Sequence, residues 1–426
     1  MIHIVRPGET LFSIAAEYGV APGFLAGQNG LAPGAALAVG QALAVRVPAE
    51  TYTVAPGDTL FSVAARAGLS VRELYRRNYA LLGRSTLVPG ETLALSYRDE
   101  AKLGTLSVNG YAYPYIDIGL LDSVLPYLTY LTPFTYGISE TGQLVPLGDA
   151  ELLTAAGLYG AQPLMHLSTL TEEGSFSNDR ASALLESPAL QEQLLQSVVQ
   201  NLRRRGYYGL DVDFEYVYPR QREAYAAFVG TLRERLAPFG YPVFAALAPK
   251  TRADQPGLLY EAHDYALLGA AADAVLVMAY EWGYAYGPPM AVAPLPQVRA
   301  VLNYAVTEVP RAKLLLGVPF YGYDWTLPFE AGVSKADSLS PQRAVELAVQ
   351  YRAEIEYDET AQAPYFYYTP RSGRSHIVWF EDARSCDAKL RLVREYGLRG
   401  IGVWNLMRPF PQGWAALDSL YVIEKA

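Results

Sequence analysis

The sequence has few of the residues that form disulfides and metal sites. It contains one cysteine, Cys386, so no disulfide can form within the chain. Its four histidines are scattered, and no two have the His-x-x-x-His spacing that puts two imidazoles on one helix face. The sequence therefore predicts no metal site, and nothing in it indicates a cofactor.

Positive charge and long apolar runs are also scarce. Lysine and arginine number 34 against 43 aspartates and glutamates, which gives a net charge of −9. Binding to nucleic acid needs a basic surface, so we expect no nucleic-acid partner. No apolar run reaches the roughly 18 residues that cross a bilayer, so we expect no membrane span and no membrane partner.

The first residues, MIHIVRPGET, do not resemble a secretory leader. A leader begins with positive charge and continues into an apolar stretch, and this segment has neither. We therefore predict that the protein is made without a signal peptide and works outside the cytoplasm only through cell lysis or through deposition on a structure assembled inside the cell.

A pattern near the N-terminus occurs twice. Residues 2–13 and 51–62 both end in Thr-Leu-Phe-Ser after a Pro-Gly turn and an acidic residue, and Gly57 follows Gly8 by 49 residues. Asn29 and Asn78 keep the same spacing. Internal similarity at such a period indicates tandem modules. We predict two βααβ modules, at residues 1–47 and 50–96.

Both modules resemble LysM modules, which bind glycans containing N-acetylglucosamine, such as peptidoglycan and chitin. The resemblance rests on the Pro-Gly-acid-Thr-Leu run and on the asparagine near the end of the second helix. It implies glycan-binding residues at Gly8, Thr10, Leu11, Asn29, Gly57, Asp58, Thr59, Leu60 and Asn78. The same residues suit a turn and a helix start, so a purely structural role stays open for them.

Beyond a linker predicted at residues 96–101, short apolar runs alternate with longer helical stretches. The predicted strands are 106–109, 130–136, 163–168, 209–215, 243–249, 274–281, 314–321 and 400–405. Eight strand–helix units predict an α/β fold, a (β/α)8 TIM barrel at residues 102–426. Three alternating segments within the longest gap predict a small α+β insertion at about 325–382, which would wall one side of the cleft.

The fourth predicted strand carries three carboxylates, Asp211, Asp213 and Glu215. Side chains alternate along a strand, so these acids share one face, which in a barrel points inward. Carboxylates so close together in an apolar interior raise at least one pKa. Glu215 comes last, at the mouth where barrel active sites lie, and is the predicted general acid.

This strand resembles the Asp-Gly-x-Asp-x-Asp-x-Glu motif of glycoside hydrolase family 18. Residues 277–281 resemble the Met-x-Tyr-Asp motif of that family, and residues 317–322 resemble its Gly-x-Pro-x-Tyr-Gly motif. Residues 400–404 end in the tryptophan that closes the family's last strand. The resemblance implies a substrate-assisted, retaining glycosidase, in which the sugar's own 2-acetamido oxygen attacks the anomeric carbon.

The resemblance also implies a role for each matching residue. Glu215 would protonate the leaving oxygen and then activate water, while Asp213 would hold the acetamido N–H. Asp211 would share a proton with Asp213, and Tyr280 would hydrogen-bond the acetamido oxygen. The implied substrate-binding residues are Trp404, which would stack on the sugar, and Tyr321, Met278, Glu281 and Tyr136. For Met278 and Tyr321, packing in the core is an equally open interpretation.

The chain departs from the family pattern at four places. Tyr208 replaces the first aspartate of the motif, Phe214 replaces a tryptophan, and Glu281 replaces an aspartate. The third strand ends in His-Leu-Ser at residues 166–168, where the family has Ser-x-Gly-Gly. None of these changes removes Glu215.

With its tandem N-terminal modules and a phenylalanine before the glutamate, the chain is similar to the spore-germination, cortex-lytic N-acetylglucosaminidases of spore-forming bacteria. This likeness implies a spore-cortex peptidoglycan hydrolase, located in the coat or cortex after synthesis in the mother cell. Its partner would be peptidoglycan or another N-acetylglucosamine polymer. Two alternatives stay open, a chitinase or chitooligosaccharide hydrolase and a non-catalytic wall-binding or coat protein. The second is less favoured, because lectin-like members typically lack the motif's glutamate.

Overall fold

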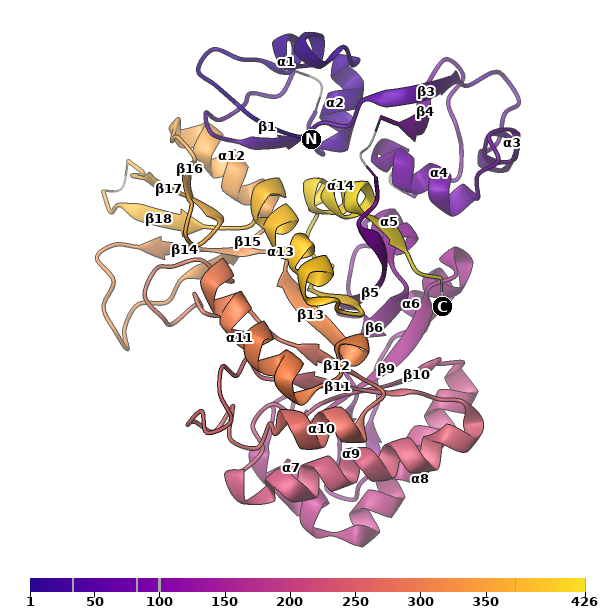
Figure 1. Ribbon diagram of the computed structural model, residues 1–426, viewed down its shortest axis with the longest axis vertical. Helices are drawn as coiled ribbons and strands as arrows, with labels where there is room; N and C mark the ends of the chain where they lie inside the picture. Colours follow the sequence, from indigo (N-terminus) through magenta and orange to yellow (C-terminus); the bar gives the residue numbers. More distant parts are fainter. Residues whose placement is uncertain (33, 82, 99–100, 372, 426) are drawn as a thin grey trace.

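The computed structural model describes residues 1–32, 34–81, 83–98, 101–371 and 373–425, and its largest part is a closed parallel barrel (Figure 1). Neighbouring strands pair in chain order, and the last, β19, pairs with the first, β5, which closes the ring. The barrel strands are β5 (Gly104–Ala112), β6 (Tyr130–Pro133), β9 (Gln162–Ser168), β10 (Gly209–Asp213), β11 (Val243–Leu247), β12 (Ala274–Val277), β13 (Leu314–Pro319) and β19 (Gly400–Trp404). The predicted eight-stranded barrel is confirmed.

Helices cover the outside of the barrel because their apolar stripes face the strands. In α9 (Arg222–Leu236), the buried residues Tyr225, Phe228, Val229, Leu232 and Leu236 form one such stripe. The other barrel helices are α5 (Ile118–Val124), α6 (Ala150–Tyr159), α7 (Asn178–Glu186), α8 (Pro188–Arg205), α10 (Tyr265–Ala271), α11 (Leu295–Glu308), α13 (Ala383–Tyr396) and α14 (Pro411–Leu420). A short strand, β20 (Tyr421–Ile423), adds to the outer edge of β5.

A second sheet lies between β13 and β19, as the alternating segments predict. It is antiparallel, in the order β15-β14-β18-β17-β16, and α12 (Pro341–Tyr351) packs on it. Its strands are β14 (Gly322–Thr326), β15 (Asp337–Leu339), β16 (Glu356–Asp358), β17 (Ala363–Tyr368) and β18 (His376–Trp379). The strands β14 and β15 are additional to the three predicted segments. In the sequence, β14 looks like a continuation of β13, because only two residues separate them.

Both N-terminal modules have the predicted βααβ order. The first contains β1 (Ile2–Ile4), α1 (Leu11–Tyr18), α2 (Pro22–Gln28) and β2 (Ala42–Ala44). The second contains β3 (Pro48–Thr53), α3 (Leu60–Arg66), α4 (Val71–Arg77) and β4 (Thr92–Tyr97). The predicted linker is wrong at its start, since β4 continues through Ser96 to Tyr97; Asp99 and Glu100 lie outside the described residues.

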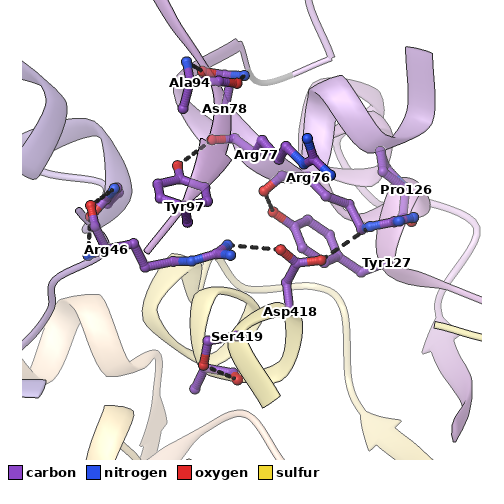
Figure 2. Close-up of polar contacts among 12 residues, drawn as sticks. Arg46, Arg76, Arg77, Asn78, Ala94, Tyr97, Pro126, Tyr127, Asp418 and Ser419 are labelled. Carbon is purple, nitrogen blue, oxygen red and sulfur yellow. Dashed lines mark hydrogen bonds and ion pairs between the residues drawn. The ribbon is translucent and has the colours of Figure 1, made fainter. Parts of the chain in front are cut away.

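Asp418 of α14 joins both modules to the barrel, as Figure 2 shows. Arg46 of module 1 donates to Asp418 Oδ2 at 2.7 Å, and Arg76 of module 2 donates to Oδ1 at 3.2 Å. Burial raises the pKa of Asp418, but the two arginines outweigh it and the pKa lies below its ordinary value. The carboxylate is therefore ionised and held between two cations.

Other contacts extend these attachments. In module 1, the carbonyl of Val39 accepts a hydrogen bond of 2.9 Å from the backbone of Ile355, next to the inserted sheet. In module 2, Arg72 donates to the carbonyls of Pro126 and Leu128 beside β6. No helix among the described residues is long and apolar enough to span a membrane.

Candidate active site

A cavity of about 340 Å³ opens at the C-terminal ends of the barrel strands. It is lined by Tyr111, Asp213, Glu215, Ala246, Pro249, Leu259, Tyr260, Leu276, Met278, Tyr280, Glu281, Trp282, Tyr284 and Trp404. Active sites of (β/α)8 barrels lie at this end, because the loops that carry functional residues follow the strands there. Six of the predicted catalytic and substrate-binding residues are brought together in this cavity.

Asp211 and Asp213 of β10, and Glu215 two residues beyond its end, lie in order from the barrel interior to the cavity. Asp211 is fully buried, Asp213 is buried at the floor of the cavity, and Glu215 follows the end of the strand. Burial raises the pKa of Asp211 to about 6 and that of Asp213 to about 7. The pKa of Glu215 rises to about 8, through burial first and then through the charges of Asp213 and Glu281. Glu215 therefore keeps its proton at neutral pH, as a general acid must.

The two aspartates have different partners. The hydroxyl of Tyr111 on β5 donates to Asp211 Oδ2 at 2.8 Å. Asp213 Oδ2 lies 3.4 Å from Nε2 of His166, the neighbour of Asp211 on β9. One oxygen of each aspartate, Oδ1, has no hydrogen-bond partner in the part of the chain that the structure describes. The proton shared between Asp211 and Asp213 stays a prediction.

His263 fixes the backbone that carries Glu215. Its Nε2 donates to the carbonyls of Phe214 at 3.0 Å and Glu215 at 3.1 Å, while its Nδ1 accepts from the backbone N–H of Ala248 at 2.9 Å. Burial lowers the pKa of His263 to about 4, so the imidazole is neutral and can accept at Nδ1. The ring thus holds the segment after β10 where the strand ladder has ended.

Glu281 lines the same cavity as Asp213 and Glu215 and is held by tyrosines. The hydroxyls of Tyr321 and Tyr323 donate to its carboxylate. Burial raises the pKa of Glu281, while these hydrogen bonds oppose that rise. Tyr323 belongs to β14, so the inserted sheet supports this side of the cavity. Tyr321 is buried beside Glu281 and is not part of the cavity lining.

The prediction that Tyr136 binds substrate is wrong. Its hydroxyl donates to Asp149 at 2.7 Å, at the start of α6, and the side chain packs against Tyr207 in the layer between strands and helices. Its neighbour Thr135 points to the interior instead, where its hydroxyl contacts His166. The strand β6 ends at Pro133, and the adjacent Phe134 and Thr135 both contact His166, so the alternation of a strand does not extend to Tyr136.

Asn29 and Asn78, predicted as glycan-binding residues, have structural roles, and their contact with a glycan stays a prediction. The amide of Asn78 donates to the carbonyls of Leu74 and Ala94 at 2.9 Å each and accepts from the N–H of Ala94 at 2.8 Å. Asn29 makes the equivalent bonds in module 1. Both side chains are buried, and their hydrogen-bonding groups tie the second helix to the last strand.

Other residues of the module motif have structural roles as well. Leu11 and Leu60 are buried in the two module cores, so their side chains cannot contact a glycan. Thr10 and Thr59 cap the first helix of each module, each in a reciprocal pair with a serine. Asp58 accepts hydrogen bonds from Tyr52 and from the backbone of Ala55. Gly8 and Gly57 are exposed turn residues with φ of 83° and 88°.

Two of the groups around the acids are not predictable from the sequence motifs. His166 differs from the family pattern without indicating a partner, and His263 lies 48 residues from Glu215. Among the described residues, no three histidine, cysteine, aspartate or glutamate side chains are grouped as metal ligands.

Comparison with known families identifies the barrel. The model of glycosyl hydrolases family 18 matches residues 173–408, and the LysM domain model matches residues 3–46 and 52–96. The chain belongs to glycosyl hydrolases family 18. It is therefore a glycosidase with two LysM modules, and both resemblances inferred from the sequence are confirmed.

Three relatives illustrate the similarity. The chain is 45% identical over 303 residues to a cortical fragment-lytic enzyme of Bacillus subtilis, with 70% of each chain covered. The crystal structure of the Bacillus cereus spore cortex-lytic enzyme SleL is 36% identical, with a TM-score of 0.84 over 100% of this chain and 98% of that one. A chitinase from Chromobacterium violaceum is 27% identical, with a TM-score of 0.69 over 74% of this chain and 98% of that one.

Proposed function

We propose that this family 18 enzyme is a spore-cortex peptidoglycan hydrolase that cleaves N-acetylglucosaminyl bonds. The observation that carries the proposal is Glu215, a carboxyl group kept protonated at the wall of a cavity beside Asp213 and Tyr280. The relatives that share both modules and barrel support the cortex as the source of the substrate.

In the first step, Glu215 gives its proton to the glycosidic oxygen as the bond from that oxygen to the anomeric carbon breaks. The 2-acetamido oxygen of the same sugar forms the new bond to the anomeric carbon, which yields an oxazolinium ion. In the second step, the Glu215 carboxylate takes a proton from water. The water oxygen bonds to the anomeric carbon as the bond from that carbon to the acetamido oxygen breaks, which restores the 2-acetamido group and gives net retention.

Two neighbours of Glu215 place the reacting acetamido group. Asp213, at the cavity floor, accepts its N–H and offsets the positive charge that develops on the oxazolinium ring. The hydroxyl of Tyr280 donates to the acetamido oxygen and aims it at the anomeric carbon. Trp404 provides an apolar face under the sugar ring, and Glu281 lies where it can accept from a sugar hydroxyl.

The two modules hold the enzyme on the glycan, and their attachment to the barrel keeps the cavity close to the bound polymer. Weak binding by two linked modules produces a higher overall affinity than either alone. We propose that the enzyme acts in the spore coat or cortex after synthesis in the mother cell.

Product analysis tests the substrate. The enzyme is incubated separately with spore-cortex fragments and with chitin oligomers, and products are identified by mass spectrometry. We expect faster release from cortex fragments, with N-acetylglucosamine at the new reducing ends. Equal or faster cleavage of chitin oligomers would favour the second candidate, a chitinase, which the likeness to the Chromobacterium violaceum chitinase supports.

A further inference from the structure

His166 lies behind the cavity floor with one ring nitrogen unpartnered. It is fully buried in the middle of β9, and its Nε2 is 3.4 Å from Asp213 Oδ2. Nε2 makes no hydrogen bond to Asp213 at this distance or to any other described residue, and Asp213 Oδ1 and Asp211 Oδ1 also have none. Buried polar atoms normally find hydrogen-bond partners, so each one left without a partner needs an explanation. Three such atoms in one place indicate a network that is completed when a proton moves or substrate binds.

The other side of the ring is held firmly. Nδ1 is 2.6 Å from the hydroxyl of Thr135, and the ring packs on Phe134 at 4.6 Å and meets Tyr111 edge-on. If Thr135 donates to Nδ1, then Nε2 carries the proton and faces Asp213 as a donor. If Nδ1 donates to Thr135, then Nε2 can accept the proton of the Asp213 carboxyl. Either arrangement lets His166 and Asp213 share one proton.

We propose that His166 is a positioning residue that shares this proton with Asp213 and aims the Asp213 carboxylate at the substrate's acetamido N–H. The proposal rests on the proposed glycosidase function. His166 is absent from the cavity lining, so it acts through Asp213 rather than on the sugar.

The electrostatic surroundings favour an uncharged imidazole. The titratable groups that face the pair are Asp211 on the same strand as Asp213, Glu215 beyond the end of that strand, Tyr111 on β5 and Tyr280 in the segment after β12. Burial lowers the pKa of His166 to about 4, although the charge of Asp211 opposes that shift. A neutral ring can stabilise ionised Asp213 by hydrogen bonding without neutralising the charge that the oxazolinium ion needs.

This role predicts a change at both sides of the pH–rate profile. Without the Nε2–H, ionised Asp213 loses a donor and its pKa rises, so the acid limb moves to higher pH. Asp213 is then charged less often, and its charge is what helps to raise the pKa of Glu215. The basic limb, where Glu215 loses its proton, therefore moves to lower pH, and the profile narrows.

Two amide substitutions separate positioning from packing. In His166→Gln the side chain can place a donor close to the position of Nε2, whereas in His166→Asn the amide reaches only the position of Nδ1. Both variants and the wild type are assayed for kcat, KM and pH profile on a soluble N-acetylglucosamine oligomer. The control is His3→Gln, which replaces a buried histidine of module 1.

We expect His166→Asn to lose roughly tenfold or more in kcat, as for one hydrogen bond to a charged group, with a narrower profile and little change in KM. We expect His166→Gln to recover most of kcat and the profile width. Equal kcat and equal pH limbs in the two variants, whether both are active or both are impaired, would overturn the proposal. If the wild type cleaves none of the glycans, the failure lies in the proposed function instead.

Discussion

At the scale of single residues, burial and charge decide the chemistry. Glu215 is held protonated by low solvation and by the nearby charges of Asp213 and Glu281. Glu281 is the residue that differs from the family's aspartate, and two tyrosine hydroxyls hold its carboxylate in the cavity wall. The charge of Glu281 therefore helps to keep Glu215 protonated, while Asp213 lies at the cavity floor.

Replacing Glu281 with glutamine tests this coupling. Removal of a negative charge near Glu215 lowers the pKa of Glu215, so the basic limb of kcat/KM should move to lower pH. The acid limb, set by Asp213, should move less. Glu234→Gln, an exposed change on α9, should leave both limbs in place. An unmoved basic limb in Glu281→Gln would contradict the coupling.

At the scale of elements, each module is tied together by one buried asparagine. The amide of Asn78 bridges the end of α4 and the strand β4 through three hydrogen bonds. Truncation would leave the backbone groups of Ala94 without partners in a small core, where little else compensates.

Asn78→Ala should therefore destabilise module 2 by roughly 1–3 kcal/mol, measured by chemical or thermal unfolding. Below the unfolding transition, binding of the variant to insoluble peptidoglycan should stay close to that of the wild type. A large loss of binding in a fully folded variant would mean that the asparagine contacts the glycan after all.

The sequence predicts elements better than side-chain partners. All eight barrel strands could be located because each is a short apolar run. Asp213 could be placed because alternation along β10 fixes its face, and Glu215 because it follows two residues later at the cavity, although the strand ends before it. Tyr136 could not be placed in this way, because β6 ends at Pro133 and alternation does not extend beyond it. His263 could not be predicted, because its contact with Glu215 depends on how distant loops meet.

At the scale of the whole molecule, Asp418 connects three parts of the chain. Arg46 comes from module 1 and Arg76 from module 2, and only 9% of Asp418 is exposed. Breaking a buried ion pair by removing one partner is costly, because the remaining charges stay buried without compensation. The modules and the barrel should therefore unfold together rather than separately.

Asp418→Asn should lower the free energy of unfolding by about 3 kcal/mol or more and separate the unfolding of the modules from that of the barrel in calorimetry. The pKa of Asp418 is depressed in the folded state, so its contribution is present above the unfolded pKa of about 3.9 and is lost as the pH falls through the folded value. Asp254→Asn, which breaks the exposed pair with Arg252, should change the stability by at most about 1 kcal/mol. Unchanged, single-step unfolding of Asp418→Asn would contradict the role of Asp418 as the link between the modules and the barrel.

The central claim, that Glu215 supplies the proton, is tested most directly by the kcat of Glu215→Gln on cortex fragments. Glutamine keeps the size of the side chain but cannot donate the proton, so kcat should fall at least about a hundredfold while binding to peptidoglycan stays unchanged. A variant that turns over at a rate close to the wild type would contradict the account.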